Sequence, residues 1–404
     1  MPYKSLPTEE PRVPIFTQNC MKQRDFKTNN FDLLRIITAI LVVVNHSLGH
    51  LQLHTPFLYT IVQQFPRVPM FFVMSGYLLS ASFERNSDLK SYFTNRLLRI
   101  YPGLWACLIL TVILFAVIGG VNFVNLQAVP WFILQMGGII YTPSFLHDFG
   151  YGSYNGSLWT IVVELQFYFA LPTLYFIGNY FFKKYNVDKK KENIFFYTVF
   201  ALAVALAIYL KVLYPSYTDE LTASKVVKYS ILPHAYIFMA GILLQRLKVY
   251  KMDFVYGKGL YWAAAYLAWV YLVPNSYFKM VPSMILLAFF TISVAYSKPG
   301  IATKYLHNRD ISYGVYLYHG MLLSLLVEFG MIGSPWYLLL TAAITFVLAI
   351  LSYRYVETPA MRLAKRKQKP RPIEQLPLEV QHEIEARKEK AALAKTVPSV
   401  EPVS

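Results

Sequence analysis

The chain has 404 residues, a formal net charge of +16 and a mean hydropathy of +0.39, with 56% hydrophobic but only 15% charged residues. Because soluble domains usually carry about 25% charged residues, this composition excludes an ordinary soluble fold. The lysines and arginines lie between long apolar runs and form no single basic face, which argues against nucleic acid as a partner. Cys20 and Cys107 give neither a disulfide framework nor the spacing of a metal site, so no metal is expected.

Apolar windows of about 20 residues predict an all-α integral membrane protein, a bundle of about ten transmembrane helices. The first apolar run is too long for a signal peptide and is interpreted as an uncleaved anchor. A shorter apolar stretch at 128–141, interrupted by two glycines, is interpreted as a re-entrant or interfacial segment. The ten predicted helices lie near 31–51, 66–83, 97–119, 157–182, 194–212, 230–246, 259–274, 280–297, 310–330 and 335–356.

The distribution of the 38 lysines and arginines predicts the orientation of this bundle. With the N-terminus inside, the inner segments hold 32 of them and the outer loops hold five. Lys and Arg are enriched in cytoplasmic loops, so both termini are predicted to be cytoplasmic. The sequence thus divides into an N-terminal cytoplasmic segment (1–30), a transmembrane domain (31–362) and a basic, mixed-charge cytoplasmic tail (363–404).

The first predicted helix carries two ionisable residues, which are costly in lipid and therefore functional candidates. Arg35 and His46 are eleven residues apart, which places them within about 20° of the same helix face and about 16 Å apart along the axis. For Arg35, snorkelling to lipid phosphates is an equally good explanation. For His46, which follows Asn45, a functional role is favoured.

Further polar groups lie in later helices. Arg96 and Arg99 lie at the inner end of the third helix, where simple positive-inside anchoring is the better explanation of the pair taken alone. Glu164 lies seven residues beyond Ser157, an apparent N-cap, and so about 10 Å below the outer surface. His46 has a similar predicted depth, so we expect these two side chains to pair. The alternative partner for Glu164 is another polar group, such as a tyrosine of the helix at 310–330.

That ninth helix presents three polar rings along its length. Tyr313, Tyr316 and His319 follow one another at intervals of three residues. Such spacing places them near one face of a helix. An aromatic packing stripe and a pore lining explain the pattern equally well.

Six short motifs are spread along the hydrophobic part of the chain. They are FDLLRIITAILVVVNHS (31–47), FFVMSGYLLS (71–80), RLLR (96–99), SLWTIVVELQFY (157–168), ISYGVYLYH (311–319) and YRYVETPAMR (353–362). In this order they resemble the motifs of the membrane-bound acyltransferase-3 family over nearly the whole of Phe31 to Arg362. Each motif alone is weak, whereas six in order on a ten-helix frame are specific. One departure is Leu165, where many members have a second acid.

The resemblance implies an enzyme that takes an acyl group, usually acetyl, from cytoplasmic acyl-coenzyme A and passes it to a sugar hydroxyl across the membrane. The implied partners are acetyl-CoA as co-substrate, an envelope glycan (lipopolysaccharide O-antigen or exopolysaccharide) or lipid-linked sugar as acceptor, and the lipid of a bacterial inner membrane. Many members carry an additional extracytoplasmic hydrolase-like domain, and we expect none here because only about forty residues follow the last helix.

The expected roles combine this resemblance with the chemistry of the side chains. Arginines suit the phosphates of coenzyme A. His46 can act as a general base, or it can carry the acyl group itself, and the sequence leaves both mechanisms open. We expect His46 and Glu164 to be catalytic, Arg35, Arg96, Arg99 and Ser75 to bind the donor, and Asn45, Trp159, Tyr168, Tyr313, Tyr316 and His319 to bind the acceptor or line a pore.

Two other classes of protein would also show buried ionisable residues. A secondary transporter or a lipid or glycan flippase would show repeat symmetry or broken helices in matching halves, and neither is visible in the sequence. A membrane receptor is disfavoured by the ordered set of motifs.

Overall fold

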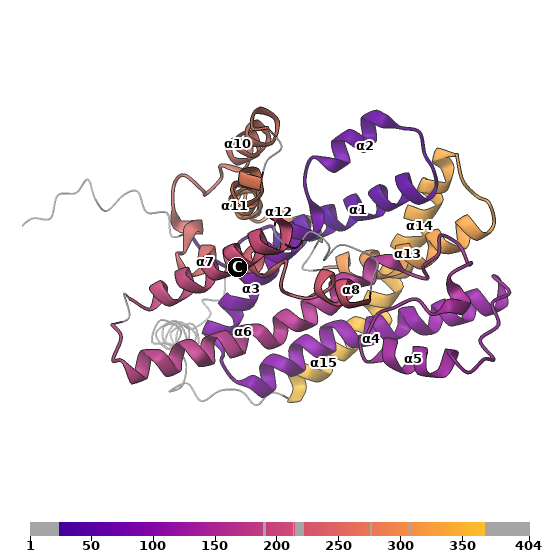
Figure 1. Cartoon of the computed structure of the whole chain (residues 1–404), viewed down its shortest axis with the longest axis horizontal. Coiled ribbons are helices and arrows are strands. Elements are labelled where there is room, and N and C mark those ends of the chain that lie inside the picture. Colours follow the sequence, from indigo (N-terminus) through magenta and orange to yellow (C-terminus); the bar gives the residue numbers. More distant parts are fainter. Residues whose placement is uncertain are drawn as a thin grey trace, which may run out of the picture.

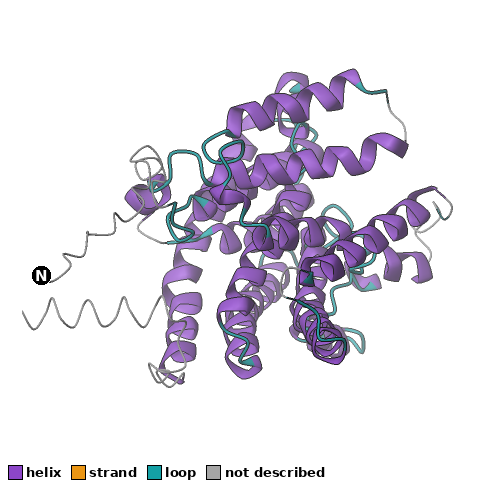
Figure 2. Cartoon of the chain, turned by 90° about the vertical axis from the view of Figure 1, so that its left-hand side faces the viewer, coloured by secondary structure: helices purple, strands orange, loops and turns teal. Residues whose placement is uncertain are grey.

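A computed structural model describes residues 24–188, 191–212, 214, 222–274, 277–306 and 309–367. Within these ranges the chain consists of helices and loops, without strands (Figure 2). Most of the predicted N-terminal segment and almost all of the predicted tail lie outside them. The longer helices are α1 (Phe31–His50), α3 (Arg67–Arg85), α4 (Leu89–Val117), α6 (Trp159–Lys184), α7 (Glu192–Val212), α9 (Ala235–Arg246), α10 (Gly259–Leu272), α11 (Tyr277–Ala295), α13 (Ser312–Glu328) and α14 (Pro335–Ser352). The shorter ones are α2 (Pro56–Gln63), α5 (Ala128–Met136), α8 (Thr222–Lys228), α12 (Ile301–Leu306) and α15 (Thr358–Lys367).

Each of the ten predicted ranges coincides with one of the longer helices. In the described part of the chain, six helical segments are long and apolar enough to cross a membrane. α9, α10 and α13 have 12, 14 and 17 residues, fewer than the roughly 20 that a single perpendicular crossing needs. The all-helical membrane architecture is therefore confirmed, and the count of ten spans stays a prediction. The six segments are Phe31–His50, Leu89–Val117, Gly156–Lys184, Glu192–Val212, Phe278–Ala295 and Pro335–Leu363.

Helix α13 lies in the centre of the bundle, against α1, α4 and α14 (Figure 1). Its residues from 314 to 326 are all buried. A helix that is enclosed on all sides can carry polar groups that lipid would not tolerate, provided that they find partners inside the protein. This position explains how two tyrosines and a histidine of one motif become internal.

Helices α3 and α9 pack closely because two glycines face each other's backbone. A Cβ atom added at Gly76 would lie 2.1 Å from the carbonyl oxygen of Phe238, and one added at Gly241 would lie 2.3 Å from that of Val73. Gly76 lies in the FFVMSGYLLS motif (71–80), and the close approach of the two helices leaves no room for a side chain at this position. The close contact fixes α3, with Ser75 turned toward the interior cavity described below.

Helix α4 begins at Leu89, eight residues before the predicted start at 97. Asp88 caps it, accepting a hydrogen bond from the backbone N–H of Ser91 at 2.8 Å. Arg96 and Arg99 therefore lie about 10 and 15 Å along the helix from its first residue. The predicted start of this helix is wrong, because the polar first turns belong to α4, and the position of the two arginines at the inner membrane face stays a prediction.

The last helices of the described chain also contribute to this part of the interior. α14 continues through a π-helical segment, Tyr353–Glu357, into α15. α15 lies beside α4, and its Met361 lines the same cavity as the two arginines of α4. At the edge of the molecule, α10 and α11 pack mainly on each other (Figure 1). The predicted segment 128–141 forms the short helix α5 and a loop against α4.

Candidate active site

Two cavities contain nearly all of the predicted site residues. The larger, here called the arginine cavity, has a volume of about 410 Å³ and is lined by Arg35, Arg96 and Arg99. The smaller, here called the histidine cavity, has a volume of about 170 Å³ and is lined by His46. Other predicted residues lining the arginine cavity are Ser75, Glu164, Tyr168, Tyr313 and Tyr316, and those lining the histidine cavity are Asn45, Trp159 and Tyr316.

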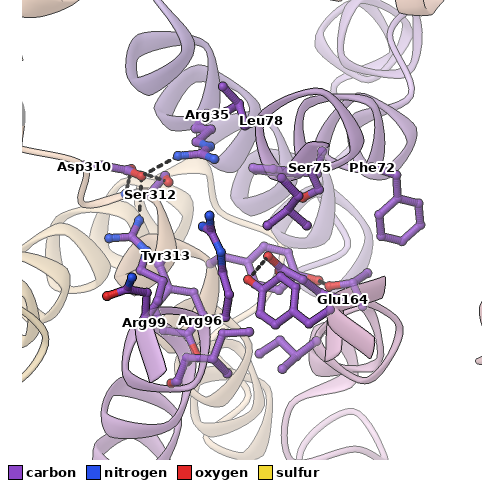
Figure 3. A pocket seen from close by; sticks show the side chains of 18 of the residues that line it. Arg35, Phe72, Ser75, Leu78, Arg96, Arg99, Glu164, Asp310, Ser312 and Tyr313 are labelled. Atoms are coloured by element: carbon purple, nitrogen blue, oxygen red, sulfur yellow. Dashed lines mark hydrogen bonds and ion pairs between the residues drawn. The ribbon is translucent and has the colours of Figure 1, made fainter. Parts of the chain in front are cut away.

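In the arginine cavity, two arginines from different helices share one carboxylate (Figure 3). Oδ2 of Asp310 lies 2.6 Å from Nη2 of Arg99 and 3.3 Å from Nη1 of Arg35. Its Oδ1 accepts a hydrogen bond of 3.0 Å from the backbone N–H of Ser312, at the start of α13. Two guanidinium groups and a backbone N–H thus surround this carboxylate, and each of them favours its charged form. The carboxylate is therefore charged and holds both guanidinium groups at the cavity wall.

Arg96 is held differently. Its Nη2 donates to Oγ of Ser82 at 2.9 Å, and its Nε is buried without a hydrogen-bond partner. Among the described residues Arg96 forms no ion pair, and Figure 3 shows its guanidinium extending into the cavity. Arg96 is partly buried and keeps donors that no described residue uses, so it is a candidate for binding an anionic ligand in this cavity.

Glu164 also lies in the arginine cavity. Its Oε1 accepts a hydrogen bond of 2.6 Å from the hydroxyl of Tyr168, one turn further along α6. The expected pairing with His46 is not seen, since His46 lines the other cavity and has a different partner. The expected N-cap is wrong too, since the hydroxyl of Ser157 donates to Asn155 and α6 begins at Trp159 after a 3-10 turn. Depth along a helix does not specify which neighbour a side chain faces, and Glu164 faces the arginine cavity. The partner is a tyrosine, as in the alternative, but from α6 itself.

The partner of His46 is His319. Nδ1 of His46 lies 2.9 Å from Nε2 of His319, whose side chain is fully buried in α13. The two rings are 5.2 Å apart between centroids and inclined by only 22°. Rings that are nearly coplanar at this separation meet edge to edge, which is the geometry of an in-plane N–H···N hydrogen bond. Nδ1 of His319 in turn contacts the carbonyl oxygen of Tyr316 at 2.8 Å.

Further groups enclose His46. His50, one turn along α1, stacks on Tyr151 with ring centroids 3.9 Å apart. Burial raises the pKa of Tyr151 to about 12, so its hydroxyl stays protonated and donates to the carbonyl of Gly320. On the other side, Arg67 lines the histidine cavity and donates to the carbonyl of Val62. Among the described residues, no carboxylate lines this cavity.

Tyr316 forms a wall between the two cavities, and Val68 lines both as well. The Tyr316 hydroxyl contacts the hydroxyl of Thr160 at 2.6 Å and donates to the carbonyl of Ser157. Its ring also meets Phe71 at 6.2 Å, edge to face. The two cavities are therefore adjacent, and a single tethered aromatic side chain stands between them.

Eleven of the twelve predicted site residues line one of the two cavities, whereas the structure places His319 behind His46 rather than in a pore. Asp310, the partner of Arg35 and Arg99, was not predicted from the sequence, and Arg67 was counted only as a loop charge. Asp310 had a visible signal, an acid directly before the apolar ISYGVYLYH motif. In the described part of the chain, no group of three or more His, Cys, Asp or Glu side chains is arranged to hold a metal ion.

Comparison with known proteins identifies the family of the chain. The profile of the acyltransferase-3 family, described as an acyltransferase domain, matches residues 28–354. Nodulation protein 10 of Rhizobium leguminosarum bv. viciae is 30% identical over 360 residues, which cover 83% of this chain and 94% of that protein. The peptidoglycan O-acetyltransferase OatA of Listeria monocytogenes is 25% identical over 335 residues, 72% of this chain and half of that protein.

A third relative, the O-acetyl transferase of Shigella phage Sf6, is 30% identical over 151 residues, 35% of this chain and 44% of that protein. No solved structure matches the chain. The family profile covers most of the sequence, including α1, the cavity-lining helices and the α13 motif. The chain therefore belongs to the acyltransferase-3 family and is a membrane-embedded acyltransferase.

Proposed function

We propose that this protein is an O-acetyltransferase that takes the acetyl group of acetyl-CoA in the arginine cavity and passes it, at His46, to a hydroxyl group of an envelope glycan. The observation that carries the proposal is the adjacency of two chemically different cavities. One has three guanidinium groups for an anionic donor, and the other has a histidine and no carboxylate among its described lining residues. The names of the relatives support acetyl as the group transferred.

Coenzyme A carries several phosphate charges, which arginine binds in charge-assisted hydrogen bonds. Among the described residues Arg96 forms no ion pair and its Nε has no hydrogen-bond partner, while Arg35 and Arg99 are oriented by Asp310. In the predicted ten-helix topology, the side of the bundle with the excess of Lys and Arg is cytoplasmic. We assign the arginine cavity to this side, where acyl-CoA is found. The thioester end then extends past Tyr316 toward His46, over the roughly 16 Å that separate Arg35 and His46 along α1.

At the histidine cavity, the acceptor hydroxyl approaches Nε2 of His46. This nitrogen removes the hydroxyl proton while the oxygen attacks the thioester carbonyl, as in general-base catalysis. The intermediate then collapses, the carbon–sulfur bond breaks, and the leaving thiolate takes the proton from the His46 imidazolium. Trp159 offers an aromatic face and Asn45 an amide beside the histidine for binding a sugar.

A transporter or flippase remains the alternative class. It would move its substrate across the membrane without transferring an acetyl group. The deciding experiment supplies radiolabelled acetyl-CoA to membranes that contain the protein and the envelope glycans of its host. We expect label in the glycan with the wild type and with His54→Ala, an exposed control, and none with His46→Ala. Absence of label with all three proteins, at normal protein levels, would contradict the proposal.

A further inference from the structure

We propose that His319 is a positioning residue that fixes the tautomer of His46, so that Nε2 of His46 is the nitrogen that takes the proton. The inference rests on the proposed function and identifies the atom and the partner through which it works. It is carried by two hydrogen bonds in series, from His46 to His319 and from His319 to the backbone of α13.

The direction of both hydrogen bonds follows from the carbonyl at the end of the chain. A carbonyl oxygen only accepts, so the contact of 2.8 Å with Tyr316 places the proton of His319 on Nδ1. In neutral His319, Nε2 then bears a lone pair. The contact of 2.9 Å from His46 must therefore be a donation from Nδ1–H of His46. Neutral His46 is left with an unprotonated Nε2, on the ring that lines the histidine cavity.

Burial makes this arrangement specific. The side chain of His319 is fully buried, on a helix that is enclosed on all sides, so water does not compete for its nitrogens. When His46 becomes an imidazolium during the reaction, its Nδ1–H still has an acceptor in place. A carboxylate plays this orienting part in the serine protease triad, whereas here the acceptor is a second, neutral imidazole.

The other charged and titratable groups around His46 do not supply this function. His50 of α1 stacks on Tyr151, and the centroid of its ring lies 6.0 Å from that of His46. In the described structure no hydrogen bond joins His50 to His46. Arg67 of α3 is a donor only, and its guanidinium bonds to the carbonyl of Val62 and to Gln63. Within the described ranges, His319 alone offers Nδ1 of His46 an acceptor.

The tautomer can be observed without any acceptor substrate. In protein labelled with ¹⁵N-histidine, the signal of His46 is identified by its loss in His46→Ala. We expect Nδ1 protonated and Nε2 unprotonated in the wild type at neutral pH. In His319→Leu we expect His46 to shift toward the Nε2–H tautomer, which is the commoner form of free neutral imidazole. A wild-type His46 that already carries its proton on Nε2 would overturn the inference, whatever the acetyl-transfer assay shows.

Activity gives the second test. His319→Leu should lower acetyl transfer by about 10²-fold or more, because the ring of His46 loses its orientation. His319→Gln should keep transfer within about tenfold of wild type, since its side-chain oxygen can accept from Nδ1–H. His319→Glu should move the acid limb of the pH–rate profile to higher pH, because a carboxylate favours the protonated His46. Donor binding and protein level should stay unchanged in all three.

A purely structural role for His319 makes different predictions. It would reduce the Leu and Gln variants equally, through protein level, and leave the acid limb in place. Either of these results, or full activity in His319→Leu, would overturn the inference. Absence of transfer in the wild type would instead refute the proposed function and leave the ¹⁵N result standing on its own.

Discussion

The arginine cavity and the histidine cavity adjoin each other, yet they are built on different principles. In the first, charge is compensated by charge, with Asp310 shared by two arginines. In the second, neutral rings are ordered by hydrogen bonds along the His46–His319–Tyr316 chain, and no carboxylate lines it within the described structure. Among the described lining residues, carboxylates therefore occur only in the arginine cavity, and the proposed function assigns donor binding to that cavity and proton transfer to the other.

The largest expected effect separates chemistry from donor binding. His46→Ala should lower acetyl transfer by at least about 10³-fold, because a general base contributes roughly 10²–10⁴-fold and its alanine substitution also removes the ring from the cavity. Binding of acetyl-CoA, measured by isothermal titration in detergent, should change less than twofold. A substantial loss of donor affinity in this variant would show that the two cavities act as one functional unit.

Next in size is the loss of a donor-binding charge. Arg96→Gln should weaken acetyl-CoA binding by about 10- to 100-fold, since a hydrogen bond to a charged group contributes about 1.5–3 kcal/mol. Arg96 is the sharper choice than Arg99, because Arg99→Gln also leaves Asp310 short of a partner and destabilises the fold. Lys90→Gln, at an exposed position near the start of the same helix, is the matched control and should bind normally. Equal affinity for acetyl-CoA in Arg96→Gln and the control would indicate that Arg96 only anchors the helix at the membrane surface.

The wall between the cavities gives an intermediate effect. Tyr316→Ala should lower transfer about tenfold and raise hydrolysis of acetyl-CoA in the absence of acceptor, because excluding water is what prevents such side reactions. Tyr316→Phe keeps the ring and loses only the hydrogen bonds to Ser157 and Thr160, so its hydrolysis should remain at the wild-type rate. Release of free coenzyme A measures both. If the alanine variant hydrolyses no more donor than the wild type, Tyr316 does not separate the cavities.

Substitution of Glu164 has the smallest expected effect and tests whether this residue acts in the arginine cavity or pairs with His46. Because its carboxylate lies with the arginines and bonds to Tyr168, Glu164→Gln should change donor KM less than about threefold and leave kcat close to normal, as expected for a partly exposed group. The pairing predicted from the sequence implies the opposite, a large fall in kcat at unchanged KM. Steady-state kinetics of this one variant therefore distinguish the two assignments.

The features that the sequence predicted are those that depend on local pattern. Apolar windows of about 20 residues predicted the positions of the longer helices. Arg35 and His46 were predicted to lie far apart along one helix, and they line different cavities. Pairings between helices depend on tilt and on where each helix begins, which composition does not specify. Because α4 begins at Leu89 rather than at 97, Arg96 and Arg99 lie further along the helix than predicted. They line the same cavity as Glu164. His319 then became the partner of His46, because α13 runs beside α1 in the centre of the bundle.

We propose that donor and acceptor are used from opposite faces of the membrane, which can be tested with sealed vesicles. Labelled acetyl-CoA is added to the outside of inside-out vesicles and of right-side-out vesicles, each with the glycan acceptor on its extracytoplasmic face. The account predicts labelled glycan only with inside-out vesicles, and with right-side-out vesicles only after the membrane is permeabilised. Labelling of the glycan in intact right-side-out vesicles would place both substrates on the same side and contradict the account.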